Sequence, residues 1–294
     1  MGWPGVPGMC RLFGFRSTIR SQMHRSLVLE RNALKQQAVE HPDGWGLAFY
    51  VGGQPQVARG VSGAFEDDDF ENLCQFISSE TVVAHVRKAS VGELTIENTH
   101  PFEHGPWVMA HNGTIPDFDA LRPVLEARLA PHFRARMHGE TDSERLFALF
   151  LTRLATRRNP HGEDISLPDL FASMEETVLE VVALCAQRGT DPSLNMVVTN
   201  GRLMAAFRHG RTLYFSTYKE RCPERDTCPA FAPCCEAPVL LGNRVNHLVV
   251  ASEIIGGAAK WEELPENELI GVDAQMRLSR RSLRLPAPAM ARSA

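Results

Sequence analysis

The sequence predicts an α+β protein with two packed sheets and no linker between domains. Strand-like segments dominate the first part of the chain, two long helical segments follow, and strand-like segments return near the end. Strands and helices gathered in separate blocks are typical of this fold class. At 294 residues with 44% hydrophobic content, the chain is long and apolar enough to bury a sizeable core.

Apolar periodicity and turn residues place the elements of the first half. His41-Pro42 ends the first helix, because proline cannot continue one. Gly52-Gly53 predicts a hairpin turn, because glycine accepts the backbone angles of a tight turn. In chain order we predict an apolar stretch at 12–15, a helix at 26–39, strands at 45–51 and 56–61, a helix at 65–79, strands at 82–87 and 107–111, and a helix at 120–129.

The second half begins with a helix-start signal. Thr141 and Glu144 have the S/T-x-x-E spacing of a capping box, and an apolar helical face follows them. A polar loop at 157–166 separates that helix from a second long one. The remaining predictions are a helix at 167–187, an antiparallel meander of strands at 195–199, 203–208 and 212–217, strands at 239–241, 247–251 and 268–272, and a flexible tail at 285–294.

Composition narrows the function classes. A net charge of −4 without a basic run argues against a nucleic-acid surface, which needs clustered Lys and Arg. The sequence has no signal-peptide pattern and no apolar run long enough to span a membrane, so we expect a cytoplasmic protein that binds small molecules rather than a membrane. Seven cysteines, an odd number, favour reduced thiols over a disulfide framework.

Cys10 stands close to the start of the chain. Initiation at Met9 followed by its removal, or cleavage between Met9 and Cys10, would make this cysteine N-terminal. Its thiol could then attack while its α-amino group, with a pKa of about 7.7–8.0, takes the proton. We therefore expect residues 1–9 to be a leader that is removed or a misassigned start. If they remain attached, the amine is an amide, and Cys10 has the ordinary role of a small hydrophobic residue.

Three further positions carry side chains suited to a small-molecule site. Period-two alternation puts Arg87 at the end of strand 82–87, where it either clamps a carboxylate or lies on the surface. Asn112-Gly113 follows a strand and either holds an oxyanion or makes a plain turn. Asp142, in the first helical turn, either receives a substrate ammonium or complements the helix dipole.

Taken together and in order, these pieces resemble the class II glutamine amidotransferase domain of the N-terminal-nucleophile hydrolases. The matching segments are MCRLFG at 9–14, DGWG at 43–46, AHVRKAS at 84–90, NTHPF at 98–102, HNGTI at 111–115 and GETDSE at 139–144. ASE at 251–253 and LPENELI at 264–270 look like the closing part of stand-alone members. The resemblance implies a single domain at 10–284 with a four-layer αββα sandwich of two antiparallel sheets flanked by helices.

The resemblance also implies roles for individual residues. Cys10 is implied to attack the side-chain amide of glutamine or another γ-glutamyl compound, with Asn112 and Gly113 stabilising the oxyanion. Neither a cofactor nor a metal is implied. The substrate-binding residues are expected to be Arg87 for the α-carboxylate, Asp142 for the α-ammonium, and Ser90 and His100 for further contacts with substrate or loops.

Some features depart from the family or carry weaker signals. Lys88 stands where synthase-linked relatives commonly have tryptophan, so the cover of the pocket is expected to differ. The histidines at 85, 100 and 111 do not have the spacing of metal ligands. Cys222-x5-Cys228-x5-Cys234-Cys235 lacks the short cysteine pairs of zinc sites, and we predict a reduced surface loop there.

The expected function is hydrolysis of the γ-glutamyl amide bond of glutamine or a γ-glutamyl metabolite through a Cys10 acyl-enzyme. Two alternatives stay open. One is a glutaminase subunit that delivers ammonia to a separate synthase partner. The other is a non-catalytic glutamine-binding protein whose Cys10 is blocked by the leader.

Overall fold

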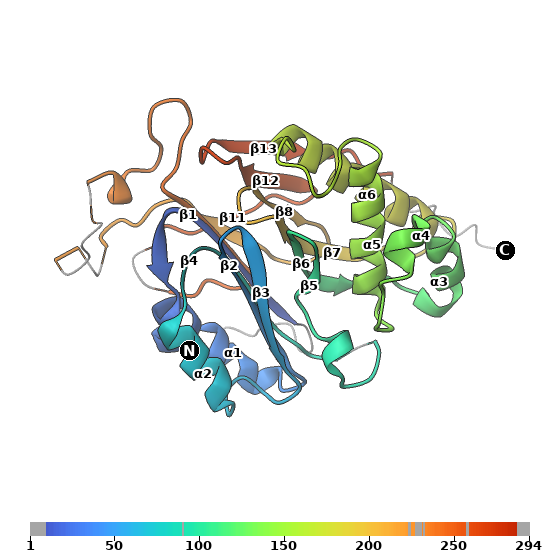
Figure 1. Ribbon diagram of the computed structural model, residues 1–294, viewed down its shortest axis with the longest axis horizontal. Helices are drawn as coiled ribbons and strands as arrows, with labels where there is room; N and C mark the ends of the chain where they lie inside the picture. Colours follow the sequence, from blue (N-terminus) through green and yellow to red (C-terminus); the bar gives the residue numbers. More distant parts are fainter. Residues whose placement is uncertain are drawn as a thin grey trace.

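Two antiparallel sheets pack face to face in this computed structural model, with helices on the outer side of each sheet (Figure 1). The structure describes residues 10–89, 91–222, 225–226, 231, 233–256 and 259–286. The leader predicted at 1–9 and most of the tail predicted at 285–294 lie outside these residues. The predicted αββα sandwich is confirmed.

Sheet 1 has seven strands in the order β11-β9-β10-β1-β4-β2-β3. The chain therefore begins in the middle of this sheet, where β1 pairs with both β4 and β10. Its strands are β1 (Arg11–Gln22), β2 (Trp45–Val51), β3 (Gln54–Gly60), β4 (Ser78–Val86), β9 (Tyr214–Ser216), β10 (His247–Ala251) and β11 (Glu262–Glu263).

Sheet 2 has six strands in the order β13-β12-β8-β7-β6-β5. Its central pair, β6 and β7, is in register from Val108 opposite Thr199 to Thr114 opposite Ser193. Its strands are β5 (Phe102–His104), β6 (Trp107–Thr114), β7 (Ser193–Thr199), β8 (Met204–Arg208), β12 (Glu268–Val272) and β13 (Leu278–Ser282).

The helices divide between the two outer faces. Sheet 1 is covered by α1 (Leu34–Gln37), α2 (Asp68–Phe76) and the short helical turns Arg25–Leu29 and Ala38–Glu40. Sheet 2 is covered by α3 (Phe118–Glu126), α4 (Pro131–Arg134), α5 (Asp142–Ala155) and α6 (Leu167–Ala186). A short turn at Ile96–Asn98 precedes β5, and another lies at Pro233–Glu236. Among the described helices, none combines the length and apolar character needed to cross a membrane.

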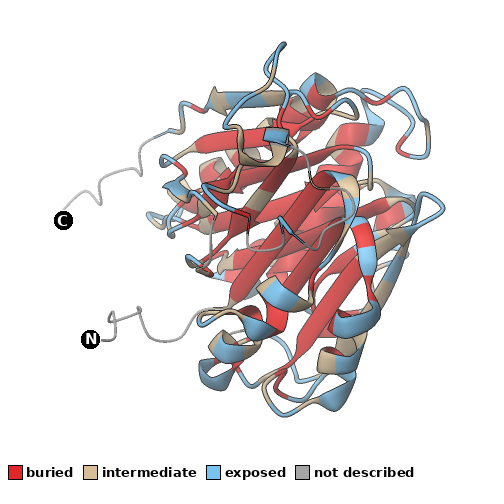
Figure 2. Ribbon diagram, turned by 90° about the vertical axis from the view of Figure 1, so that its left-hand side faces the viewer, coloured by how far each residue is buried: buried red, intermediate tan, exposed pale blue. Residues whose placement is uncertain are grey.

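The core has three layers that follow from strand alternation. Val82 and Ala84 face the helices outside sheet 1, whereas Val83 faces sheet 2. Val108 and Ala110 likewise face sheet 1 across the sandwich. Burial of apolar side chains on both faces of both sheets drives this arrangement. Figure 2 shows the buried residues along the strands and the exposed ones along the outer sides of the helices.

The single helix predicted at 26–39 is wrong. The segment forms a π-helical turn, then α1, then a 3-10 turn, with Glu30 in an extended conformation between them. Asn32 is held by the distant loop at 254–255: its backbone N–H donates to Ile255 O (3.3 Å) and its side chain to Ile254 O (2.8 Å). Because the Asn32 backbone N–H bonds to this loop and not to a carbonyl of a preceding helical turn, the helix is interrupted at Asn32.

The predicted three-strand meander is also wrong in its last step. β7 and β8 pair as expected, but β9 joins β10 and β11 in sheet 1. Asn195 fixes this crossing, because its side chain donates to Arg211 O (3.1 Å) and Thr212 O (2.9 Å) and accepts from His209 N (2.9 Å). The turn after β8 therefore leads the chain from one sheet to the other.

The strand predicted at 239–241 does not form. Leu240 N donates to Arg244 O at 2.7 Å across a tight turn in which Gly242 and Asn243 both have positive φ. Leu241 is 97% exposed, as expected for a turn and not for a sheet strand. Sequence patterns also missed β5, β11, β13 and the one-turn helix α4, which are all short.

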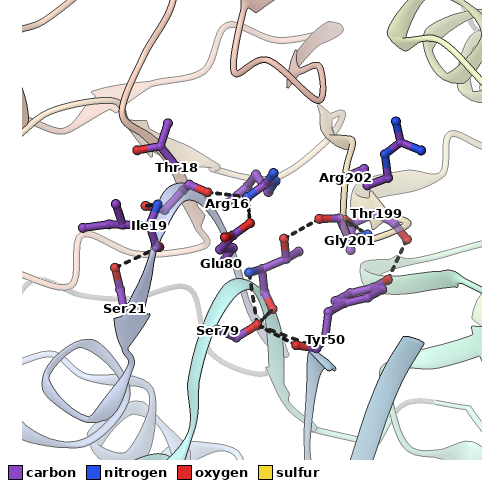
Figure 3. A network of polar contacts seen from close by, with 12 residues as sticks. Arg16, Thr18, Ile19, Ser21, Tyr50, Ser79, Glu80, Thr199, Gly201 and Arg202 are labelled. Carbon is purple, nitrogen blue, oxygen red and sulfur yellow. Dashed lines mark hydrogen bonds and ion pairs between the residues drawn. The ribbon is translucent and has the colours of Figure 1, made fainter. Parts of the chain in front are cut away.

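Hydrogen bonds join the two sheets at the end of the sandwich shown in Figure 3. The Tyr50 hydroxyl at the end of β2 lies 3.1 Å from Thr199 O and 2.8 Å from Pro106 O, both at sheet 2. Thr81 Oγ1 on β4 donates to Gly201 O at 2.8 Å. Burial raises the pKa of Tyr50 well above its usual value, so this hydroxyl stays protonated and able to donate.

We expect Tyr50→Phe to lower the free energy of unfolding by about 1 kcal/mol, the usual net value of one hydrogen bond. Urea denaturation measures this change. Tyr214→Phe is the matched control, because the Tyr214 hydroxyl takes part in none of the side-chain hydrogen bonds found between described residues. An equal effect of both substitutions would contradict a specific role for Tyr50 in joining the sheets.

Candidate active site

Cys10 lies immediately before β1 and is partly buried. Its Sγ is 3.3 Å from Lys88 O and accepts a hydrogen bond from Lys88 N at 3.2 Å, so the sulfur rests against the residue that follows Arg87. Burial raises the pKa of the Cys10 thiol. The Lys88 backbone N–H and the charges of Arg211 and Arg87 act in the opposite direction and favour the thiolate.

Strand alternation directs the predicted site residues toward the space between the sheets. Leu12 on β1 and Val83 on β4 belong to the inter-sheet layer, and Leu12 is paired with His85. Cys10 is two residues before Leu12, and Arg87 is four residues after Val83, so both continue these inward-facing rows. The end of the sandwich opposite Tyr50 therefore carries polar side chains between the sheets.

Arg87 is 3% exposed, so the alternative prediction that this arginine lies on the surface is wrong. Its guanidinium donates to three carbonyl oxygens of the following loop, those of Glu93 (3.0 Å), Val91 (3.0 Å) and Gly92 (3.3 Å). Within the described parts of the chain, Arg87 forms no ion pair with an acidic side chain. A buried guanidinium without such a pair can still receive an anion.

Asn112 is connected to the start of β1 through one hydroxyl. Asn112 Nδ2 donates to Ser252 Oγ at 3.0 Å, and the same oxygen accepts from Leu12 N at 3.1 Å. The Asn112 amide is thereby linked through Ser252 to Leu12, which is two residues after Cys10. Because a primary amide carries two N–H donors, the second Nδ2 hydrogen remains for another acceptor.

Gly113 occupies a position that tolerates no side chain. A Cβ built there would lie 1.9 Å from Ser193 O and 2.3 Å from His111 Nε2. Gly113 also lies within the β6 ladder, opposite Leu194. Asn112-Gly113 is thus part of a strand and not the plain turn that was the alternative to a functional role.

Asp142 begins α5 and is only 4% exposed. One carboxylate oxygen accepts from Ile115 N (2.8 Å), and the other accepts from Ser143 N (2.8 Å) and Ser143 Oγ (3.2 Å). The N-cap half of the predicted capping box is confirmed, since Thr141 Oγ1 accepts from Glu144 N, whereas the Glu144 carboxylate accepts from His138 N and Gly139 N instead of completing the box. Asp142 is held as an acceptor where β6 meets the N-terminus of α5.

The rings of His100 and His85 contact each other in a tilted arrangement, with centroids 4.3 Å apart and an interplanar angle of 37°, and the His100 centroid lies 6.5 Å from that of His111. Both ring nitrogens of His85 and of His100 are buried without a hydrogen bond of ordinary geometry among the described residues. Burial lowers the pKa of His85 to about 3 and that of His100 well below its usual value. Both rings are therefore neutral near pH 7. In the described part of the chain, no group of three His, Cys, Asp or Glu could hold a metal ion.

Two sequence predictions cannot be placed. Ser90 lies outside the described residues, as does Cys228 of the 222–235 insertion. Cys222 and Cys235 are described and are both free thiols, with Cys222 buried. A cavity of about 410 Å³ lies between α2 and the β2-β3 hairpin, and its lining includes none of the predicted site residues.

Arg211 and Ser252 contact this site but were not predicted from the sequence. The Arg211 guanidinium donates to Asn112 Oδ1 at 2.8 Å from the crossing between β8 and β9. No motif marks this arginine, because a chain crossing between sheets has no sequence period. Ser252 belongs to the ASE segment at 251–253, which suggested the family but no specific contact.

The fold and the family model define the class. Two antiparallel sheets flanked by helices form the αββα sandwich that the motif resemblance implied. The chain belongs to the class-II glutamine amidotransferases, whose family model matches residues 9–225. The family resemblance inferred from the motifs is confirmed.

Two named relatives are each less than 30% identical to this chain. The Escherichia coli protein named "Putative glutamine amidotransferase YafJ" is 29% identical over 211 residues, covering 68% of this chain and 72% of that protein. A gamma-glutamyl-hercynylcysteine sulfoxide hydrolase of Mycobacterium tuberculosis is 26% identical over 233 residues, covering 78% and 75%.

Two solved structures share the fold. A glutamine aminotransferase class-II domain protein from Silicibacter pomeroyi superposes with a TM-score of 0.61 at 17% identity, covering 94% of this chain and all of that one. The glutamine phosphoribosylpyrophosphate amidotransferase of Bacillus subtilis superposes with a TM-score of 0.57 at 15% identity. That match covers 93% of this chain but only 49% of the Bacillus subtilis enzyme.

The buried neutral histidines predict a stability that depends on pH. Between the folded pKa of His85, about 3, and its unfolded value of 6.5, only the unfolded state binds the proton, so stability falls as pH decreases through this range. His85 alone should make the free energy of unfolding about 1 kcal/mol lower at pH 5.5 than at pH 7.5.

His85→Phe should therefore reduce the loss of unfolding free energy between pH 7.5 and 5.5, measured by urea denaturation at each pH. His132→Phe, at an exposed position of α4, is the control and should leave the pH dependence as it is in the wild type. An unchanged pH dependence in His85→Phe would show that this ring is not held neutral.

Proposed function

We propose that this chain hydrolyses the γ-glutamyl amide bond of glutamine or a γ-glutamyl metabolite through a Cys10 acyl-enzyme. The observation that supports it best is the bridge formed by Ser252. One hydroxyl oxygen accepts from Leu12 N and from Asn112 Nδ2, which joins the nucleophile's strand to a candidate oxyanion donor. The family membership supports an amidotransferase activity in general.

The proposed chemistry needs Cys10 at the N-terminus. The α-amino group takes the thiol proton as Sγ attacks the amide carbon, and the C–N bond breaks when that proton is passed to the leaving amine or ammonia. Water then attacks the thioester and releases the γ-carboxylate and the thiol. The oxyanion of both steps would be stabilised by Asn112 Nδ2 and the Gly113 N–H.

Arg87 and Asp142 are proposed to bind the glutamyl end of the substrate. The Arg87 guanidinium is buried, bonded only to neutral carbonyl oxygens, and able to pair with an α-carboxylate. One Asp142 oxygen already accepts from Ser143 N and Oγ, whereas the other accepts from Ile115 N and keeps a further lone pair for an ammonium. Ser90 and His100 are proposed to contact the substrate or the loops around it.

Hydrolysis of a γ-glutamyl metabolite is the preferred form of this proposal. It is supported by the similarity to the gamma-glutamyl-hercynylcysteine sulfoxide hydrolase, which extends over 78% of the chain. Delivery of ammonia to a separate synthase subunit is the alternative. Comparing turnover of free glutamine with that of γ-glutamyl dipeptides distinguishes the two forms.

We expect an electrophilic glutamine analogue to label Cys10 in a chain that begins at Cys10. Peptide mass spectrometry reads both the N-terminus and the modified residue in one experiment. The Cys10→Ser variant should not be labelled, and Cys74, which is buried, should remain free in both proteins. A chain that retains residues 1–9 and stays unlabelled would contradict the proposal and favour a glutamine-binding protein.

Asp142→Asn should raise KM for the γ-glutamyl substrate about 10- to 100-fold, because a charge-assisted hydrogen bond to the ammonium is lost. The effect on kcat should be smaller, since the group is remote from the breaking bond. Steady-state kinetics measure both constants. Asp117→Asn, at an exposed position paired with Arg188, is the control and should change neither. A loss confined to kcat would argue against Asp142 as the ammonium receptor.

A further inference from the structure

We infer that Arg211 is a positioning residue of this site, which fixes the orientation of the Asn112 amide and supplies a positive charge near Cys10. The inference rests on the proposed function, in which Asn112 stabilises the oxyanion. Arg211 lies in the segment that crosses from β8 in sheet 2 to β9 in sheet 1.

Hydrogen-bond polarity carries the argument. An arginine side chain has only donors, so the atom of Asn112 that it contacts at 2.8 Å must be the amide oxygen. The amide nitrogen then faces Ser252 Oγ and the start of β1. Without Arg211, the amide could rotate by half a turn, because the Ser252 hydroxyl can donate as well as accept. A rotated amide would present an oxygen to the oxyanion and repel it.

The guanidinium is itself fixed by neutral partners. Nε donates to Ser193 Oγ at 3.2 Å, and a terminal nitrogen lies 3.4 Å from Thr114 Oγ1. Its backbone is held as well, since Arg211 O accepts from Arg208 Nε (2.8 Å) and from Asn195 Nδ2 (3.1 Å). Arg211 is therefore oriented before any substrate arrives, which is what a preorganised site requires.

The charge of Arg211 is not cancelled by an ion pair. None of the ion pairs between described residues includes Arg211. The charged or titratable groups close enough to influence it are Cys10 and Arg11 at β1 and Asp142 at α5. Arg11 is paired with Glu253 at 3.1 Å, whereas Arg87, immediately after β4, acts on Cys10 together with Arg211. Two cations without acidic partners therefore favour the thiolate of Cys10.

Arg211→Gln removes the charge and the fork of donors, whereas Arg211→Lys keeps the charge alone. We expect Arg211→Gln to lower kcat about 10- to 100-fold with little change in KM, somewhat less than the loss of a complete oxyanion donor. Arg211→Lys should recover part of this loss. Arg202→Gln, an exposed arginine in the β7-β8 turn at the opposite end of the sandwich, is the matched control (Figure 3). A kcat for Arg211→Gln within twofold of wild type would overturn the inference.

A double-mutant cycle tests whether Arg211 acts through Asn112. In the Asn112→Ala background, Arg211→Gln should lower kcat by much less than in the wild type, because the amide that it orients is absent. Equal losses in both backgrounds would overturn the positioning role. Thermal unfolding of each variant separates these results from misfolding, and Arg211→Met, which also removes the charge and the donors, replaces Arg211→Gln throughout if the latter does not fold.

The rate of Cys10 alkylation by iodoacetamide, followed by peptide mapping across pH, provides a readout that needs no turnover. Its midpoint should move to higher pH in Arg211→Gln and stay near wild type in Arg211→Lys. Coincident profiles for all three proteins would overturn the electrostatic part of the inference. A wild-type protein that does not hydrolyse γ-glutamyl substrates would instead remove the proposed function, and the alkylation profiles would still decide whether Arg211 acts on Cys10.

Discussion

Close packing of the two inner sheet faces is the constraint on which the rest of the structure depends. At the centre there is no room for extra atoms: a Cβ added to Gly14 would lie 2.8 Å from a Val197 methyl group. Polar side chains facing inward are therefore confined mainly to the ends of the sandwich. At one end Tyr50 and Thr81 join the sheets by hydrogen bonds, and at the other Cys10 and Arg87 face the same interior.

Burial at the second end sets the chemistry available there. Removal from water raises the pKa of the Cys10 thiol and keeps His85 and His100 neutral, so it disfavours the charged form of all three groups. The arginines at 87 and 211 remain as cations, bonded to neutral oxygens. A partly buried site with positive charge suits an anionic intermediate better than it suits a neutral amide, which is the difference in binding that the proposed catalysis requires.

Regular elements made much of this site predictable. Period-two alternation placed Arg87 on the same face as Val83, and the capping pattern at Thr141 placed Asp142 at the start of a helix. Neither local pattern could indicate that Arg87 would contact the loop at 91–93, because that contact depends on how the loop folds. The interrupted helix at 26–39 has a similar cause, since Asn32 is held by a loop 222 residues further along the chain.

The hydrogen bonds of Asn195 explain both the wrong prediction of a third meander strand and the omission of Arg211 from the predicted site. A third meander strand would have kept 212–217 in sheet 2, and Arg211 would then belong to an ordinary hairpin turn. Asn195 instead binds the backbone of Arg211 and Thr212 and leads the chain across to sheet 1. That crossing brings the Arg211 guanidinium to Asn112. Sequence periodicity follows residues along a strand, so a functional residue placed by a crossing between sheets is identified only when the tertiary structure is known.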